Sequence, residues 1–194
     1  MLKRKRNLII NKSGLKKGKL LDIGSATGYF LNTMKQTGWE VEGIEQDLDA
    51  QQLAKNKFGI QSYLPKDIYN LPTQSYDVIT LWHVLEHIHQ LNENLYQMHQ
   101  LLKPNGVLIV AVPNHQSFDA VFYEKYWAGW DIPIHLWHFS VKSMQKLMDK
   151  WEIDKMSGLT DEAEKARDYL MKLPARMAKI SERLVIPQES HIFK

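Results

Sequence analysis

The chain has 194 residues, of which 44% are hydrophobic, and this is enough for one globular domain with a sizeable core spanning residues 1–194. It contains no cysteine, which excludes disulfides, thiolate metal sites and a cysteine nucleophile. The formal charge of +3 comes largely from a basic N-terminal flank, residues 1–18. This flank has no interleaved aromatics, so we expect it to be solvated and expect no nucleic-acid partner.

No apolar run approaches the roughly 20 residues of a membrane span, so no integral membrane segment is expected. The N-terminus also lacks the apolar core of a signal peptide, and we therefore expect a cytoplasmic protein.

Short β-like runs alternate with longer amphipathic segments, which is typical of an α/β fold with a mainly parallel sheet. The expected strands are residues 19–23, 40–45, 61–63, 76–81 and 106–112. The expected helices are residues 29–37, 49–58, 92–102 and 140–150.

The pattern degrades after residue 150. Residues 151–156 indicate one more strand. Residues 157–194 indicate a helical segment that is followed, at residues 188–194, by a final edge strand. An apolar stripe in the helical part either packs on the domain's own sheet or forms a lid or a homodimer helix.

The turn after the first strand is the most informative motif. Asp22 ends a buried run, and small residues then lead the chain into a helix, as in nucleotide pockets at the carboxyl edge of a sheet. A dinucleotide fingerprint requires glycine where Tyr29 stands, and a P-loop requires a lysine that residues 22–30 lack. The turn therefore predicts a nucleoside ligand without a phosphate chain.

Two further acids follow the next strands. Glu45 lies 21 residues beyond Gly24, close to the spacing at which a second strand delivers a carboxylate to ribose hydroxyls; the alternative is a surface acid. Asp67 follows the third strand, where it can accept from an adenine amino group while Ile68 packs on the ring. Taken alone, Asp67 is a turn residue or helix cap.

Together these blocks resemble the class I S-adenosylmethionine-dependent methyltransferases, in particular their bacterial small-molecule branch. The resemblance covers about residues 19–155 in the family's order. It rests on the glycine motif, the ribose acid and three later stretches, residues 76–87, 101–114 and 127–140. It implies a Rossmann-like, doubly wound, mainly parallel sheet of seven strands with an antiparallel last strand.

The resemblance also implies where S-adenosylmethionine binds and S-adenosylhomocysteine is released: methionine at the glycine turn, ribose on Glu45, adenine near Asp67, and the methyl group near residues 81–83. The implied cofactor-binding residues are Asp22, Gly24, Ser25, Ala26, Gly28, Tyr29, Phe30, Glu45, Gln46, Asp67, Ile68, Leu81, Trp82 and His83. Ala26 departs from the family's usual glycine, which matters if that position needs positive φ. Independently, an acidic rim suits a cofactor with net positive charge.

Methyl transfer needs alignment above all, because the carbon is already activated by positive sulfur. A base is needed only for a hydroxyl or a protonated amine, and His83 and His135 are the candidate catalytic residues. His135 and His138 form an HxxH pair, but without a nearby third ligand we expect no metal site. The aromatics of residues 122–137 either line an acceptor pocket or form ordinary core.

The preferred function is methyl transfer to a small-molecule or lipid-linked acceptor, most simply at oxygen. The alternative is a non-catalytic S-adenosylmethionine-binding module or partner subunit. Nucleic-acid methylation is disfavoured, because Trp82-His83-Val84-Leu85 stands where an Asn-Pro-Pro-Tyr motif is required.

Overall fold

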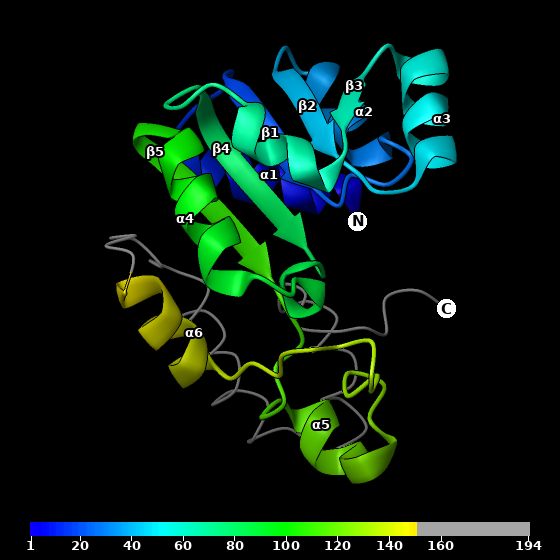
Figure 1. Cartoon of the computed structure of the whole chain (residues 1–194), viewed down its shortest axis with the longest axis vertical. Helices are drawn as coiled ribbons and strands as arrows, with labels where there is room; N and C mark the ends of the chain where they lie inside the picture. The colour runs from blue at the N-terminus through cyan, green and yellow to red at the C-terminus, as the bar shows by residue number, and fades with distance from the viewer. Residues whose placement is uncertain (151–194) are drawn as a thin grey trace. The chain divides into compact units, whose positions relative to one another are not determined.

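A computed structural model describes residues 1–150. The chain divides into two compact units (Figure 1). Among the described residues, the first contains residues 1–84 and 90–110, and the second contains residues 85–89 and 111–150. The assignment of residues 1–194 to a single domain stays a prediction.

The first unit is built on a sheet with strand order β3-β2-β1-β4-β5 (Figure 1). Its strands are β1 (Lys19–Ile23), β2 (Glu40–Ile44), β3 (Gln61–Tyr63), β4 (Tyr76–Trp82) and β5 (Leu102–Ala111). β1 pairs in parallel with both β2 and β4, and β2 pairs in parallel with β3. Ile23 lies beside Ile44 and Leu81 in register, so the carboxyl ends of three strands meet at one edge.

The helices of this unit are α1 (Leu2–Ser13), α2 (Tyr29–Lys35), α3 (Leu48–Phe58) and α4 (Leu91–Leu101), with a 3-10 turn at Pro65–Asn70. α4 buries one face, because its apolar residues recur at helical spacing and all face the core: Leu91, Leu95, Met98 and Leu101. α3 begins after Asp47, whose carboxylate accepts from the backbone N–H groups of Asp49 and Ala50.

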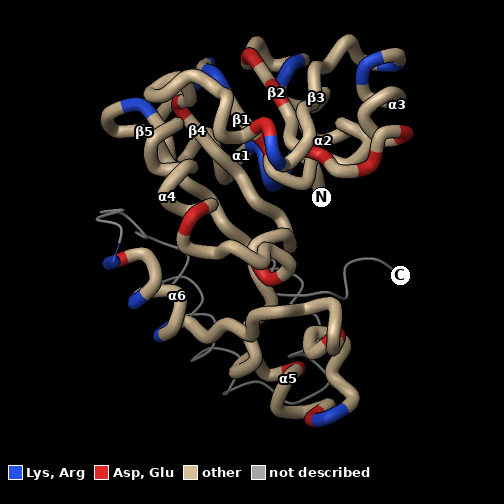
Figure 2. The backbone as a smooth tube through the Cα atoms, viewed as in Figure 1, with Lys and Arg blue, Asp and Glu red and all other residues tan. Residues whose placement is uncertain are grey.

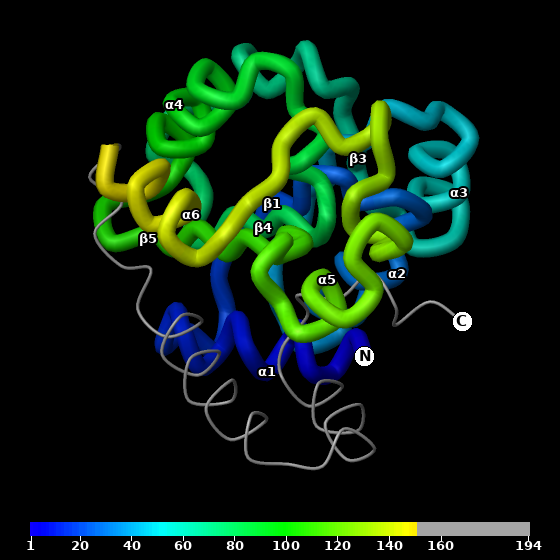
Figure 3. The backbone as a smooth tube through the Cα atoms, turned by 90° about the horizontal axis from the view of Figure 1, so that it is seen from below, coloured from blue at the N-terminus to red at the C-terminus, as the bar shows by residue number. Residues whose placement is uncertain are grey.

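The N-terminal segment differs from the solvated flank that its charge predicts. Residues 2–13 form α1, which contacts α2 and β4 and buries Leu8 and Ile9. α1 and α4 lie on opposite faces of the sheet (Figures 1 and 3), and Lys and Arg are spread along α1 (Figure 2). Lys3 and Arg4 are therefore on the exposed side of α1, whereas Leu8 and Ile9 are on its buried side.

The expected strands and helices up to residue 150 are confirmed, with ends that shift by a few residues. The largest difference is β5, which begins at Leu102 rather than Gly106, although Asn105 keeps a turn-like φ of 66°. Residues 1–150 contribute five strands to the sheet, so the seven-stranded count and the antiparallel last strand stay predictions. The strands expected at 151–156 and 188–194 and the lid or homodimer helix lie outside the described residues.

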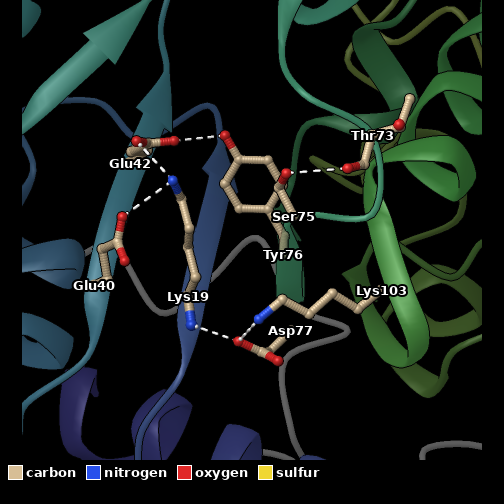
Figure 4. A network of polar contacts seen from close by, with 8 residues as sticks. All are labelled: Lys19, Glu40, Glu42, Thr73, Ser75, Tyr76, Asp77 and Lys103. Carbon is tan, nitrogen blue, oxygen red and sulfur yellow. Dashed lines mark hydrogen bonds and ion pairs between the residues drawn. The ribbon is translucent and has the colours of Figure 1, made fainter.

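A polar network joins the amino ends of the central strands (Figure 4). Lys19 Nζ lies 3.0 Å from Glu40 Oε1 and 3.1 Å from Glu42 Oε1, and the Tyr76 hydroxyl donates to Glu42. Asp77 accepts from the backbone N–H of Lys19 at 2.7 Å. These contacts tie β1 to β2 and β4 at the end of the sheet opposite the carboxyl edge.

The second unit contains α5 (Phe118–Tyr123), α6 (Val141–Asp149) and short 3-10 turns at Leu85–His87 and Glu124–Tyr126. α6 begins at a capping box in which Ser140 Oγ accepts from the backbone N–H of Ser143. A parallel bridge pairs Asn114 with Phe139 and holds the start and end of the intervening loop together. Within residues 1–150, every helix is too short or too polar to cross a membrane.

Candidate functional site

The turn between β1 and α2 has the left-handed backbone that its glycines predict. Gly24, Ala26 and Gly28 have φ of 75°, 46° and 77°. A Cβ on Gly24 would lie 2.3 Å from Val84 Cγ2, and one on Gly28 would lie 2.8 Å from Ala54 Cβ. Ala26 therefore occupies a positive-φ position, the condition under which its departure from glycine matters. Its exposed side chain leaves the methyl group free of close packing.

Glu45 lies beside this turn, because it follows β2 by one residue and β2 pairs with β1. Its Oε2 accepts from the backbone N–H of Ala26 at 2.7 Å, and its Oε1 accepts from that of Asp47 at 2.9 Å. Two backbone donors thus fix the carboxylate, and each oxygen retains an acceptor position. The positive φ of Ala26 is part of the geometry that aims its N–H at Glu45.

Asp22 is the buried acidic residue at the carboxyl edge of the sheet, with 2% of its surface exposed. It lies in register with Thr80 on β4, and the Thr80 hydroxyl donates to Asp22 Oδ1. Burial raises the pKa of Asp22 to about 7, and the charge of Glu45 adds to the rise. The Thr80 hydrogen bond and the positive charge of Lys5 oppose it.

Lys5 is a site residue that the sequence analysis missed. It projects from α1, and its Nζ lies 4.4 Å from the centre of the Trp82 ring and 5.5 Å from that of Phe30. Those two rings meet edge to face at 5.8 Å. Burial lowers the pKa of Lys5, and the charge of Asp22 partly offsets this. The sequence does contain a signal for this helix, because the apolar run at residues 8–10 interrupts the basic flank and gives the segment a side that can be buried.

The residues expected at the adenine end lie on the 3-10 turn at 65–70. Ile68 is 2% exposed, and Asp67 Oδ2 accepts from the backbone N–H of Leu64 at 3.0 Å. Asp67 thus caps its own turn, which is the role of a turn residue or helix cap that the sequence alone also allows. Its contact with adenine stays a prediction. Gln46, next to Glu45, is exposed.

The residues expected at the methyl end lie at the carboxyl end of β4 and directly after it. Leu81 is fully buried and pairs with Ile23, so Trp82 and His83 emerge at the carboxyl edge beside the glycine turn. His83 has φ of 59°, a left-handed conformation that is uncommon for a residue with a side chain. Such strain persists when the surrounding structure requires it, and it is frequent at functional positions.

His135, the second candidate catalytic residue, belongs to the second unit, whereas His83 belongs to the first. His135 Nδ1 lies 2.8 Å from the carbonyl oxygen of Gly129, and His138 Nε2 lies 2.9 Å from that of Trp130. The HxxH pair therefore engages backbone carbonyls separately.

The aromatic residues of the second unit differ in burial, and an acceptor pocket lined by them stays a prediction. Trp127 is 3% exposed and belongs to the core, whereas Phe122 and Tyr126 are 62% and 79% exposed.

A parallel sheet of this order, a left-handed glycine turn after β1 and an acid fixed after β2 are the features of class I S-adenosylmethionine-dependent methyltransferases. The profile of the Methyltransferase domain family matches residues 2–152, and the chain belongs to this family. S-Adenosylmethionine is the cofactor of this class.

Several relatives share the matching region. The chain is 30% identical over 112 residues to the demethylmenaquinone methyltransferase of Tropheryma whipplei (strain Twist), covering 55% of this chain and 47% of that protein. It is 29% identical over 102 residues to the mitochondrial ubiquinone biosynthesis O-methyltransferase of Schizosaccharomyces pombe, covering 48% and 37%. The chain thus spans about half or less of the length of these relatives. A methyltransferase structure from Archaeoglobus fulgidus has the same fold, with a TM-score of 0.63, 21% identity and coverage of 78% and 66%.

The end of the chain matches a different family. The profile of the Fatty acid desaturase family matches residues 134–192, and the chloroplastic stearoyl-[acyl-carrier-protein] 9-desaturase 1 of Arabidopsis thaliana is 45% identical over 40 residues. That match covers 21% of this chain and 10% of the desaturase. Most of the region lies outside the described residues.

Proposed function

We propose that the chain transfers a methyl group from S-adenosylmethionine to a small-molecule or lipid-linked acceptor, most simply at oxygen. The observation that carries the proposal is the fixed carboxylate of Glu45 beside the left-handed turn, with the buried acid Asp22 on the adjoining strand end. The names of the quinone-biosynthesis relatives support an acceptor of this class.

The residues at the edge fit this cofactor chemically. The hydroxyl of Ser25 is buried against β2, since a Cβ on Gly43 would lie 2.3 Å from it, so the solvent-accessible acceptor of this turn is the carboxylate of Glu45. Glu45 keeps acceptor positions for two vicinal hydroxyls, and Asp22 offers negative charge to an ammonium or sulfonium group. When bound, S-adenosylmethionine supplies a methyl group on positively charged sulfur.

The chain's own residues would then orient the methyl donor and accept a proton. We propose that the turn and Glu45 hold the nucleoside and methionine, while Trp82 and His83 flank the methyl group. His83 is the first candidate for a base, since it follows β4 in a strained conformation at the carboxyl edge. His135 is the second, and we propose no role for a metal in the methyl transfer.

Removal of the Glu45 carboxylate is expected to weaken S-adenosylmethionine binding by about 10- to 100-fold, the loss of one or two charge-assisted hydrogen bonds. Calorimetric titration of Glu45→Ala measures this. The matched control is Glu40→Ala, which removes the same charge from the opposite end of β2, where the side chain is 66% exposed. Unchanged affinity in Glu45→Ala would sink the ribose assignment.

The alternative, a non-catalytic S-adenosylmethionine-binding module, predicts tight binding without turnover. Incubation of the full chain with methyl-labelled cofactor and a metabolite extract distinguishes the two. An enzyme releases S-adenosylhomocysteine and labels an acceptor, and His83→Gln is expected to slow this transfer by a larger factor than it lowers cofactor affinity. Binding without label in any acceptor would favour the module.

A further inference from the structure

A cluster of three potential metal ligands lies within the second unit. Glu86 and His87 come from the turn at Leu85–His87, and His135 comes from the loop before α6. One ligand atom from each lies within 4.8 Å of the other two. Glu86 is 1% exposed and the side chain of His135 is 9% exposed, so the cluster is largely shielded from solvent.

Backbone hydrogen bonds hold the two segments of the cluster together. The carbonyl oxygen of Glu86 accepts from the N–H groups of Leu136 at 2.8 Å and Trp137 at 3.3 Å. The indole N–H of Trp137 donates to the carbonyl oxygen of Ile88 at 2.7 Å. The backbone positions of the two segments that carry the three residues are therefore held together by these contacts.

Both histidines are oriented as metal-binding histidines are. His87 Nδ1 lies 3.3 Å from the carbonyl oxygen of Ile134, and His135 Nδ1 lies 2.8 Å from that of Gly129. A carbonyl oxygen only accepts, so each Nδ1 carries the proton and each neutral ring keeps its Nε2 lone pair for a ligand. Metal-ligating histidines typically donate their second ring N–H to a carbonyl or carboxylate in this way.

We propose that Glu86, His87 and His135 form a site for a divalent transition metal of the zinc type. Two imidazoles and one carboxylate are a donor set that suits Zn²⁺ and leaves a coordination position open. The rings of His87 and His135 meet edge to face at 4.8 Å between centroids. With metal–ligand distances of about 2.0–2.2 Å, side-chain rotations that bring the donor atoms closer together complete the site.

Asp131 is positioned to support the site. Its Oδ2 lies 3.9 Å from His135 Nε2, within reach of a metal bound to that nitrogen. His138 does not belong to the cluster, and its Nε2 lies 2.9 Å from the carbonyl oxygen of Trp130. The metal-binding pattern is therefore not the HxxH pair of the sequence but a contact between segments about fifty residues apart.

The proposal is tested on the full chain after chelator treatment and dialysis, with Co²⁺ as a spectroscopic substitute for Zn²⁺. One equivalent of Co²⁺ is expected to produce visible absorption bands of a low-coordinate nitrogen and oxygen site, and Zn²⁺ is expected to displace them. His135→Ala and Glu86→Gln are each expected to lower Zn²⁺ affinity at least about 100-fold in competition with a chromophoric chelator.

His138→Ala and His89→Ala are the controls, since both remove a nearby imidazole that lies outside the cluster. They are expected to bind Zn²⁺ like the parent chain, and circular dichroism establishes that each variant is folded. If a variant fails to fold, protection of His87 from diethyl pyrocarbonate by Zn²⁺ in the parent chain gives the second readout. The proposal is overturned if the parent chain does not bind Zn²⁺, or if folded Glu86→Gln and His135→Ala bind Zn²⁺ as strongly as the parent chain. It is also overturned if Zn²⁺ does not protect His87 from diethyl pyrocarbonate.

Discussion

Gly24→Ala is expected to destabilise the chain by about 3 kcal/mol or more and to weaken S-adenosylmethionine binding. Two costs add. A side chain at φ of 75° costs roughly 1–2 kcal/mol, and the new Cβ would lie 2.3 Å from Val84 Cγ2, so the turn or the segment after β4 must move. Chemical denaturation measures the loss of stability.

Gly14→Ala is the matched control for the backbone cost alone. Gly14 has φ of 69°, but a Cβ there meets nothing within 4 Å. The two variants should therefore differ by the cost of the contact with Val84. Combining Gly24→Ala with Val84→Ala should recover part of that difference. Equal destabilisation by Gly14→Ala and Gly24→Ala would contradict a close approach between the turn and Val84.

Asp22→Asn is expected to become progressively more stable than the parent chain as pH rises. The pKa of Asp22 is raised from 3.8 to about 7 in the folded chain, so between these values the folded state holds a proton that the unfolded state has released. The parent chain therefore loses stability over this interval, by up to about 4 kcal/mol, while the amide does not titrate and still accepts from Thr80. Unfolding free energies from pH 4 to pH 8 measure this.

Asp77→Asn is the control with the opposite sign. Although burial opposes it, hydrogen bonds from Lys103 and from the backbone N–H of Lys19 lower the pKa of Asp77. The Asp77 carboxylate therefore stabilises the fold at any pH above the pKa that Asp77 has in the unfolded chain. This stabilisation disappears as the pH falls through the lower pKa that Asp77 has in the folded chain. Asp77→Asn should be less stable than the parent near neutrality, with a difference that shrinks in acid. A pH-independent difference between Asp22→Asn and the parent contradicts the raised pKa.

The titration of Asp22 also bears on cofactor binding. A bound cation near Asp22 favours the carboxylate, so binding near pH 6 is expected to release protons. Calorimetry in buffers of different ionisation enthalpy detects this release, and Asp22→Asn should reduce it.

The sequence predicted the parts of the site that follow from strand order and spacing. Asp22 and Glu45 lie at the ends of strands whose apolar runs are evident, and parallel pairing brings such ends to one edge. The positive φ of the glycine turn likewise follows from its residues. The five strands and the helices α2, α3, α4 and α6 were predictable because hydrophobic periodicity indicates them directly, whereas α1 and α5 were not among the expected elements.

The parts that the sequence did not reveal depend on packing between distant segments. The position of Lys5 against Trp82 follows from how α1 packs, and charge alone concealed the apolar side of that helix. The approach of His135 to Glu86 and His87 rests on backbone hydrogen bonds between a turn and a loop, which leave no periodic signal. His135 and His138, the pair that the sequence spacing indicated, instead contact different carbonyl oxygens, with ring centroids 6.5 Å apart.

Strand β1 begins with Lys19 in the network of Figure 4 and reaches Asp22 three residues later. At about 3.3 Å per residue, the two lie roughly 10 Å apart along the strand. The charges that shift the pKa of Asp22 are those of Lys5 and Glu45, not those of the network. Protein engineers can therefore redesign Lys19, Glu40 and Glu42 for heat tolerance while the proton affinity of Asp22 stays as it is.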